Sequence, residues 1–540
     1  MQWLKWWSRI HKCRCECWVL RPSRQLPRSK IYTNISGSDR RRSRTQLGKF
    51  LPAERLVAAL DCGTSSTKAI ALNSAGKVVA ESSAPLAIYT PRPGWVEHDP
   101  HEVIKSATVA LDDLLEQVSS KSVVALGVSN QRESLVLWDR ESGEPLSPLL
   151  SWQDRRTRSI ARTLLDRGYG ETVRRISGLP LDPMFSAVKA TWLLNTYDPK
   201  RARARNGALV MGTVDSWIAW NLTGVCTTDI GNASRMSLLD IETGQWSAEL
   251  LDIFDVPREC LPFIGPSMRS DVAITNGQLA GRPLGALVGD SHAALFSHKG
   301  WKPGTTKVTV GTGSSVMTTA PQVVGDSGLC RTISWQLTDD RPSLALEANI
   351  LAAGATLSWL AGLLNLTPAA LADEAKSSTN VVFVPAFDGL GAPYWDDAAV
   401  ATVSGLSLST ERADLARAAL DSVAMQIADV FEALNEAGVA MTETLVDGGM
   451  ARNTSLVSAI ANASGASVLV ADAAHASAVG AADLAGLSVG LWTMNDLNSR
   501  NSTYRRVEPE QSADVRQDKR AKWKTAVQRS REYGYDRRGK

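Results

Sequence analysis

The sequence predicts an α/β protein made of two similar lobes that face each other across a cleft. A chain of 540 residues is too long for one hydrophobic core, so two lobes of about 200 to 250 residues each are expected. A strand, a turn rich in glycine and hydroxyl residues and a second strand follow one another at 56–72, and the arrangement recurs at 307–318. Further strands and helices come in a similar order after each of these hairpins.

The turns of the two hairpins have the composition of a phosphate-binding site. They consist of Asp61, Cys62, Gly63, Thr64, Ser65, Ser66, Thr67 and Lys68 in the first hairpin, and of Gly311, Thr312, Gly313, Ser314 and Ser315 in the second. Glycine lets the backbone bend close to a phosphate, whose oxygens accept from successive N–H groups and from hydroxyls. Asp61 adds a carboxylate where a phosphate-bound magnesium ion would sit. An ordinary hairpin turn is the alternative for either segment alone, and their repetition favours two turns that hold one nucleotide.

The segments after the first hairpin follow the order of one actin-like, or ribonuclease-H-like, lobe. A third strand is expected at 78–80, so this lobe opens as a three-stranded meander. A helix is expected at 100–118, and buried strands at 123–128 and 135–138 enclose a polar loop. The second hairpin restarts this order, which places the boundary between the lobes at 300–305.

The predicted parts of the chain are a basic leader at 1–55, a first actin-like lobe at 56–302, a second actin-like lobe at 303–505, and a C-terminal helix with a charged tail at 506–540. In the second lobe, a long helix is expected at 413–437, and a strand at 444–446 leads into another glycine turn. Trp523, Ala526 and Val527 lie at helical spacing in the last part and indicate one docking face.

The first 55 residues do not have the pattern of a folded segment. Residues 1–50 hold 13 Lys and Arg against two acids, so the net charge of +3 for the whole chain becomes −8 for the remainder. A transit peptide would also be basic and poor in acids. No methionine lies between Met1 and Met184. We expect instead that the leader is an upstream extension and that the natural start lies near Val57, on a non-AUG codon.

The composition indicates a cytoplasmic protein. The acidic body gives no reason to expect a nucleic-acid partner. The seven cysteines form no disulfide framework and suit a reducing compartment. No apolar run reaches the roughly 20 residues that cross a bilayer, so no membrane span is predicted. The sequence leaves open whether the chain forms a homo-oligomer.

A carboxylate follows a buried strand just before the predicted boundary between the lobes. The strand at 284–288 leads into Gly289, Asp290 and Ser291. A carboxylate at the mouth of a cleft can accept a proton from a substrate hydroxyl. Capping the helix that begins near Ala293 is an equal alternative for Asp290.

A polar cluster lies between two buried strands, at Asn130, Gln131, Arg132 and Glu133. Arg132 can clamp a hydroxyl or the phosphoryl oxygens during transfer, and Glu133 can fix neighbouring hydroxyls. The alternative is an exposed loop held by salt bridges. Trp152 follows the next strand, where its indole either walls off the carbon side of a small substrate or belongs to the core.

Nine short segments, taken together, resemble one known family. They are 61–68, 93–100, 130–133, 152–154, 212–217, 232–235, 384–387, 391–395 and 446–449. In this order they resemble the FGGY family of carbohydrate kinases, and within it most closely the members that act on glycerol. The resemblance extends from about Leu56 to Trp523, nearly the whole body of the chain.

This resemblance implies two actin-like lobes that close on ATP, Mg²⁺ and a small polyol or sugar. By this likeness Asp290 is the general base, Arg132 assists it, and Asp61 and Asp290 hold magnesium. The residues expected at the nucleotide are Thr64, Ser65, Ser66, Lys68, Gly311, Thr312, Gly354, Ser358, Gly449, Met450 and Thr454. Those expected at the substrate are Arg132, Glu133, Trp152, Met184, Asp290 and Ser291. The protein's work in phosphoryl transfer is mainly to position groups and to stabilise charge.

The departures from the family pattern concentrate in the expected substrate pocket. Met184 stands in place of a tyrosine, Ser291 in place of a glutamine and Ser315 in place of a phenylalanine. The loss of two aromatic walls and a long amide predicts a roomier, wetter pocket, which favours a longer polyol or a ketose. Glycerol, phosphorylated at a terminal hydroxyl, remains the first candidate on overall similarity. A sugar sensor without catalysis is a hypothesis of a different class, and the presence of Asp61 and Asp290 argues against it.

Overall fold

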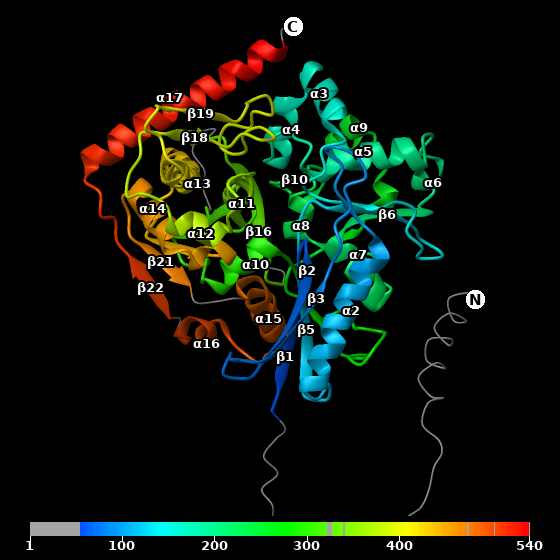
Figure 1. Ribbon diagram of the computed structural model, residues 1–540. Helices are drawn as coiled ribbons and strands as arrows, with labels where there is room; N and C mark the ends of the chain where they lie inside the picture. The colour runs from blue at the N-terminus through cyan, green and yellow to red at the C-terminus, as the bar shows by residue number, and fades with distance from the viewer. Residues whose placement is uncertain (1–53, 321–326, 339–340, 472–474, 502, 539–540) are drawn as a thin grey trace, which may run out of the picture. The chain divides into compact units, whose positions relative to one another are not determined.

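The computed structural model describes residues 54–320, 327–338, 341–471, 475–501 and 503–538 (Figure 1). The chain divides into two compact units, 1–52 and 53–540, and the described residues belong to the second. The predicted leader therefore lies outside the described residues, apart from Glu54 and Arg55. Within the described part of the chain, no helix combines the length and the apolar character needed to cross a membrane.

The first lobe is built on a five-stranded sheet in the order β13-β5-β1-β2-β3. Its strands are β1 (Leu56–Cys62), β2 (Ser66–Leu72), β3 (Val78–Pro85), β5 (Val123–Asn130) and β13 (Leu284–Gly289). β1 pairs with β2 antiparallel and with β5 parallel, and β2 pairs with β3 antiparallel, so the predicted meander is present. One face of this sheet packs against α2 (Pro100–Gln117) and α7 (Val214–Thr223). Helix α2 begins where the Asp99 side chain accepts from the His101 N–H and Pro100 occupies the first helical position.

The second lobe is built on a seven-stranded sheet in the order β16-β17-β15-β14-β20-β21-β22. Its strands are β14 (Thr305–Val310), β15 (Ser314–Thr319), β16 (Cys330–Trp335), β17 (Ser343–Ile350), β20 (Glu443–Asp447), β21 (Val468–Ala471) and β22 (Tyr504–Val507). β14 pairs with β15 antiparallel and with β20 parallel, as β1 does with β2 and β5. The helices α11 (Gly354–Leu363), α12 (Pro368–Asp373), α13 (Arg412–Glu436) and α14 (Thr454–Ser464) pack on one face of this sheet.

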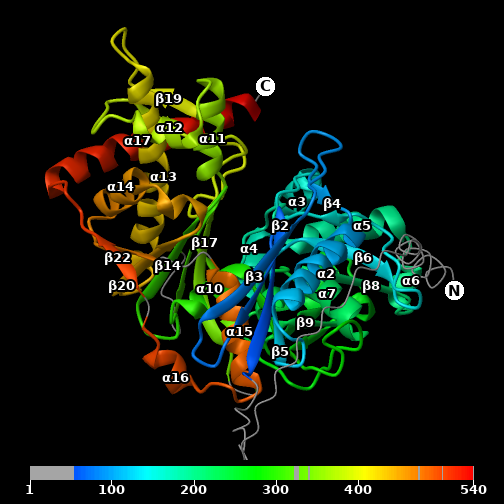
Figure 2. The ribbon, with the colours of Figure 1, turned by 60° about the horizontal axis from the view of Figure 1, so that its bottom comes forward.

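Two helices, α10 (Asp290–Ser297) and α15 (Ala476–Ser488), lie between the two sheets (Figure 2). Their small residues permit a close approach, because a Cβ on Gly480 would lie 1.9 Å from the carbonyl oxygen of Ala293. Helix α15 also packs against the first sheet, where a Cβ on Gly127 would lie 2.2 Å from the carbonyl oxygen of Ala481. The predicted lobe boundaries stay a prediction, and α15, which lies within 303–505, contacts strands of the first sheet.

A smaller sheet extends the first lobe between β5 and β13, in the order β4-β7-β6-β8. Its strands are β4 (Glu97–His98), β6 (Leu135–Asp139), β7 (Leu149–Leu150) and β8 (Leu209–Thr213). The helices of this region are α3 (Arg158–Asp166), α4 (Gly170–Ser177), α5 (Ser186–Tyr197), α6 (Ala202–Arg205), α8 (Ile230–Ser234) and α9 (Ala248–Phe254). Asp229 caps α8 by accepting from the N–H groups of Gly231 and Asn232, which fixes the helix that carries Asn232 and precedes Arg235.

The last helix, α17 (Ala513–Arg538), packs against α13 and β18 (Val382–Val384). Trp523, Ala526 and Val527 are buried, so the predicted docking face is present. The indole N–H of Trp523 donates to Asp429 of α13 at 2.7 Å, and Arg520 pairs with the same carboxylate.

Candidate active site

The turn of the first hairpin brings a partly buried carboxylate to the space between the sheets. The hydroxyl of Ser129, at the end of β5, donates to Asp61 Oδ1 at 2.5 Å. Burial, and to a smaller extent the nearby charge of Asp290, raise the pKa of Asp61. Two carboxylates, one near the end of β1 and one at the start of α10, therefore repel each other, which is an arrangement that a divalent cation would relieve.

The turn of the second hairpin gathers the residues predicted at the nucleotide. The N–H of Gly354, at the start of α11, donates to the carbonyl of Gly311 at 2.9 Å, and the carbonyl of Thr312 accepts from two further N–H groups of the same segment. A Cβ on Gly354 would lie 2.5 Å from the Gly311 carbonyl oxygen and 3.3 Å from the Met450 side chain. Gly448 has a φ of 92°, and a Cβ there would lie 2.5 Å from the Val310 carbonyl. Glycine is required at both close approaches.

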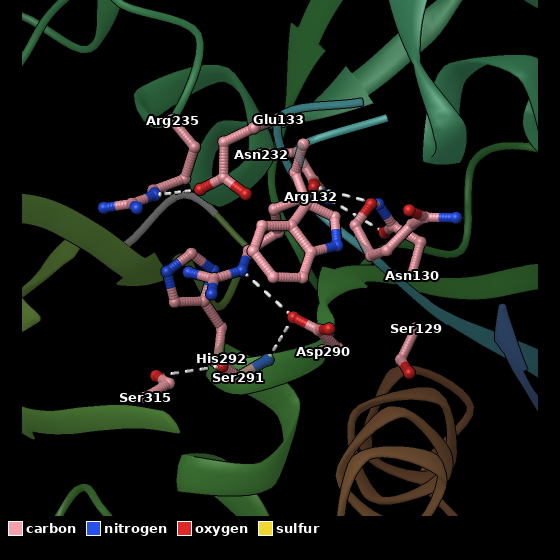
Figure 3. Close-up of polar contacts among 12 residues, drawn as sticks. Ser129, Asn130, Arg132, Glu133, Asn232, Arg235, Asp290, Ser291, His292 and Ser315 are labelled. Carbon is pink, nitrogen blue, oxygen red and sulfur yellow. Dashed lines mark hydrogen bonds and ion pairs between the residues drawn. The ribbon is translucent and has the colours of Figure 1, made fainter. Parts of the chain in front are cut away.

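The polar cluster at 130–133 is buried, so the alternative of an exposed loop is wrong. The side-chain amides of Asn130 and Asn232 donate to each other's oxygens at 3.0 and 3.1 Å (Figure 3). This pair fixes the start of the loop against α8. Glu133 has a φ of 62°, a left-handed conformation that is strained for a residue with a side chain and is typical of functional sites.

Asp290 is the first residue of α10 and lies directly after β13. Arg132 Nε donates to Asp290 Oδ1 at 3.0 Å, and the backbone N–H of Ser291 donates to the same oxygen at 2.7 Å (Figure 3). The N-cap of α10 is Gly289, so Asp290 is not the N-cap; its carboxylate accepts from one N–H of the first helical turn and from Arg132. The Asp290 side chain is 37% exposed and can still meet a substrate hydroxyl.

Trp152 connects the first turn with the predicted substrate side. Its indole N–H donates to the Thr64 hydroxyl at 3.1 Å. Trp152 is therefore neither only a core residue nor only an apolar wall of the substrate pocket. Met184 is buried in a small apolar cluster with Phe185, against which Trp152 and Trp395 pack. The rings of Phe185 and Trp395 are 5.9 Å apart. Met184 therefore shares its cluster with one aromatic side chain, and two more pack against that cluster.

A cavity of about 810 Å³ lies between the first hairpin and the strands β20, β21 and β22. Among the residues predicted at the nucleotide or the metal, Asp61, Lys68, Gly449 and Thr454 line it. Ser65, Thr312 and Ser358 are exposed, and Ser66 and Met450 are partly buried. The volume is in the range of small-molecule and cofactor sites.

Two charged residues that we did not predict lie beside Arg132 and Glu133. Arg235 Nε donates to Glu133 Oε1 at 2.6 Å, and Arg132 Nη1 donates to Glu347 Oε2 at 2.6 Å (Arg235 and Glu133 in Figure 3). Arg235 ends one of the family segments, at 232–235, which was a usable signal. Glu347 is the one charged residue of β17, and that was the only signal for it.

The comparisons with known proteins agree with this geometry. The models for the N-terminal and C-terminal domains of the FGGY family of carbohydrate kinases match residues 56–296 and 306–489. The chain belongs to this family. A glycerol kinase of Pseudothermotoga lettingae is 39% identical over 493 residues, which cover 88% of this chain and 99% of the relative. A glycerol kinase of Rhodopirellula baltica is 38% identical over 520 residues, 92% of this chain and 96% of the relative.

Solved structures of family members have the same fold. The crystal structure of Plasmodium falciparum glycerol kinase with ADP matches with a TM-score of 0.81 and 28% identity, over 88% of this chain and 98% of that one. A xylulose kinase from Rhodospirillum rubrum matches with a TM-score of 0.77 and 24% identity, over 89% and 100%, which shows the fold alone. The predicted α/β fold of two actin-like lobes is confirmed, and the chain is a carbohydrate kinase.

Proposed function

We propose that this kinase transfers the γ-phosphoryl group of ATP to a terminal hydroxyl of glycerol, giving glycerol 3-phosphate. The observation that carries the proposal is the Asp290 carboxylate, held by Arg132 and the Ser291 N–H beside Asp61. The similarity over nearly the whole chain to proteins named glycerol kinase supports glycerol as the acceptor.

Asp290 is proposed as the general base that takes the proton from the attacking hydroxyl. Its oxygen Oδ1 accepts two hydrogen bonds, which fix the carboxylate plane before the substrate arrives. The buried guanidinium of Arg132 lies at the same place and can hold either a substrate hydroxyl or a phosphoryl oxygen. Glu133 supplies acceptors for neighbouring hydroxyls of the polyol.

The nucleotide is proposed to lie between the two turns. The predicted hydroxyls are those of Thr64, Ser65, Ser66 and Thr312, the predicted backbone contacts are those of Gly311, Gly354, Gly449 and Met450, and Lys68, Ser358 and Thr454 complete the set. The hydrogen bonds from α11 to Gly311 and Thr312 hold the second turn in place for this role.

Asp61 and Asp290 are suited to a magnesium ion that arrives with the nucleotide. Mg²⁺ is commonly held by one or two carboxylates together with phosphate oxygens and water, so it needs no larger group of protein ligands. The described residues contain no group of three or more His, Cys, Asp or Glu side chains arranged to hold a metal. Bound there, Mg²⁺ would neutralise charge on the transferring phosphates.

A coupled assay of ADP release, run over glycerol, C4 and C5 polyols and ketopentoses, tests the proposal. We expect the highest kcat/KM with glycerol. A higher value with a longer polyol or a ketose would instead support the roomier pocket suggested by Met184, Ser291 and Ser315. Absence of turnover with every acceptor would overturn the proposal and favour a ligand-binding sensor.

Replacement of Asp290 with Asn tests the proposed base. We expect kcat to fall by about 10²- to 10⁴-fold, the usual worth of a positioned general base. The Asn oxygen can still accept from Arg132 and from the Ser291 N–H, so ADP binding measured by calorimetry should be retained. A nearly unchanged kcat would remove Asp290 from this role.

A further inference from the structure

We infer that Glu347 is a positioning residue for phosphoryl transfer: from the second lobe it holds Arg132, and through Arg132 it sets the orientation of Asp290. The inference rests on the proposed kinase function and adds to it a residue that does not touch the substrate.

The contacts form one continuous chain of alternating charges. Arg132 Nη1 donates to Glu347 Oε2 at 2.6 Å, while Arg132 Nε donates to Asp290 Oδ1 at 3.0 Å. Arg235 Nη1 lies 3.1 Å from the same Glu347 oxygen, and Arg235 Nε donates to Glu133 at 2.6 Å. A guanidinium is planar and rigid, so a contact on one edge fixes where its other nitrogens point. The position of Glu347 therefore determines how Arg132 presents Nε to Asp290.

The chain of ion pairs crosses from the first lobe to the second at Glu347. Arg132 follows β5 of the first sheet, and Arg235 follows α8 in the first lobe. Glu347 lies in β17 of the second sheet, opposite Met317 of β15. Relative movement of the lobes that displaced β17 would remove a carboxylate from Arg132 and Arg235 together. The ion pairs thus connect the arrangement of the lobes to the arrangement of the proposed base.

The charges at the centre of this chain of ion pairs are out of contact with water, whereas the Asp290 side chain at its end is 37% exposed. The side chains of Glu347 and Arg235 are fully buried, and that of Arg132 is 5% exposed. Although burial alone would raise it, the charges of Arg132 and Arg235 hold the pKa of Glu347 well below its usual range. Glu347 is therefore an ionised carboxylate, and the loss of its charge would leave two buried guanidinium groups with less compensation.

Two hydroxyls connect Glu347 to the start of α10 by a second route. Ser315 Oγ donates to Glu347 Oε1 at 3.0 Å, and Ser291 Oγ donates to Ser315 Oγ at 3.1 Å (Figure 3 for the two serines). Ser291 also supplies the N–H that binds Asp290. These are two of the positions at which the chain departs from the family pattern, so this second route belongs to this chain's own sequence.

The experiment compares Glu347→Gln with a matched control, Asp429→Asn. Asp429 is also a buried carboxylate paired with an arginine, Arg520, but it lies between α13 and α17. For Glu347→Gln we expect kcat with glycerol to fall by about 10- to 100-fold, the effect of a small misplacement of catalytic groups. The Kd for ADP should remain close to that of the wild type. For Asp429→Asn we expect an unchanged kcat.

The outcomes separate the inference from the proposed function. A wild-type protein without kinase activity on any polyol overturns the proposed function. If the wild type is active and Glu347→Gln folds, an equal kcat for the two proteins overturns the inference. Should Glu347→Gln fail to fold, Ser315→Ala decides, because it keeps every charge and removes only one donor to Glu347. A reduced kcat at unchanged Tm then supports the inference, and an unchanged kcat contradicts it.

Discussion

Side chains from other segments contact the turn of the first hairpin, whereas the backbone at the start of a helix contacts the turn of the second. In the first turn, Ser129 donates to Asp61, and Thr64 lies between Trp152 and Gln131, accepting from the first and donating to the second. In the second turn, the carbonyls of Gly311 and Thr312 accept from the N–H groups at the start of α11.

This difference exists although the two hairpins occupy equivalent places in their sheets. Each begins with a central strand that has an antiparallel partner on one side and a parallel partner on the other. The shared topology places each turn directly after a central strand of its sheet. Asp61 contributes a carboxylate to the first turn, and N–H groups at the start of α11 support the second.

The carboxylates that line the cavity differ in the same way between the lobes. Asp61 has its pKa raised by burial and by the charge of Asp290. Burial acts in the same direction on Asp447 of β20, but the hydrogen bond with His298, at 2.7 Å, lowers the pKa of Asp447 overall. Asp447 is therefore a charge that the protein has already compensated, whereas Asp61 is one that remains to be compensated by a ligand.

Replacement of Asp61 with Asn should have the largest effect among the tests of this comparison. We expect kcat to fall by about 100- to 1000-fold, the worth of one electrostatic group aimed at the reacting charge. The Asn oxygen can still accept from the Ser129 hydroxyl, so the hairpin should persist. Ser129→Ala is the matched control: it keeps the carboxylate, and its kcat should remain far closer to the wild type. A near-normal kcat for Asp61→Asn would show that its charge is dispensable.

The same variant should be more stable than the wild type at neutral pH. Folding raises the pKa of the Asp61 carboxyl group above 3.8, so the group binds its proton more tightly in the folded state. Its contribution to stability therefore falls as the pH rises from the unfolded-state pKa through the folded-state pKa. Asp61→Asn removes this loss of stability. The difference in Tm between Asp61→Asn and the wild type should vanish as the pH falls below 3.8. Asp447→Asn should instead lower the Tm at neutral pH, because the pKa of Asp447 is lowered on folding. Equal shifts in both variants would contradict the contrast.

Replacement of Gly354 with Ala tests the backbone support of the second turn. The new Cβ would lie 2.5 Å from the Gly311 carbonyl oxygen, so α11 and the turn must move apart. We expect the Kd for ADP to rise by about 10- to 100-fold, because a small displacement of binding groups in a site has effects of this size. Gly362→Ala, in the same helix with no atom within 4 Å of the new Cβ, is the control and should leave Kd unchanged. Equal affinity in the two variants would mean that the turn does not depend on α11.

The sequence predicted the parts of the fold that depend on local pattern. The hairpins, the meander, α2 and the long helix α13 all follow from periodicity and from turn residues. The sequence does not predict where α15 packs, because its small residues would permit a close approach to either sheet. Gly127 of β5 and Gly480 of α15, which permit that approach, are informative only once the two segments are known to meet.

The candidate site was predictable where a short segment carried its own chemistry. Asp290 and the cluster at 130–133 stood out because polar residues followed buried strands. Glu347 did not, since its partner Arg132 lies 215 positions away in the sequence and no local spacing connects them. The prediction of a roomier pocket from Met184, Ser291 and Ser315 rests on single positions, and it stays a prediction. Phe185 belongs to the same apolar cluster as Met184, and Trp395 packs against that cluster.

Replacement of Trp152 with Phe tests the connection between the first turn and the substrate side, and should have the smallest effect. Phe keeps a ring but loses the N–H that donates to Thr64, a hydrogen bond worth about 0.5–1.5 kcal/mol. We expect the KM for glycerol to rise by about 2- to 10-fold with little change in the Kd for ADP. Trp138→Phe is the control, because its buried indole N–H has no hydrogen-bond partner among the described residues. If both variants changed the KM alike, loss of ring volume would explain the effect, and Thr64 would have no part in aligning the substrate.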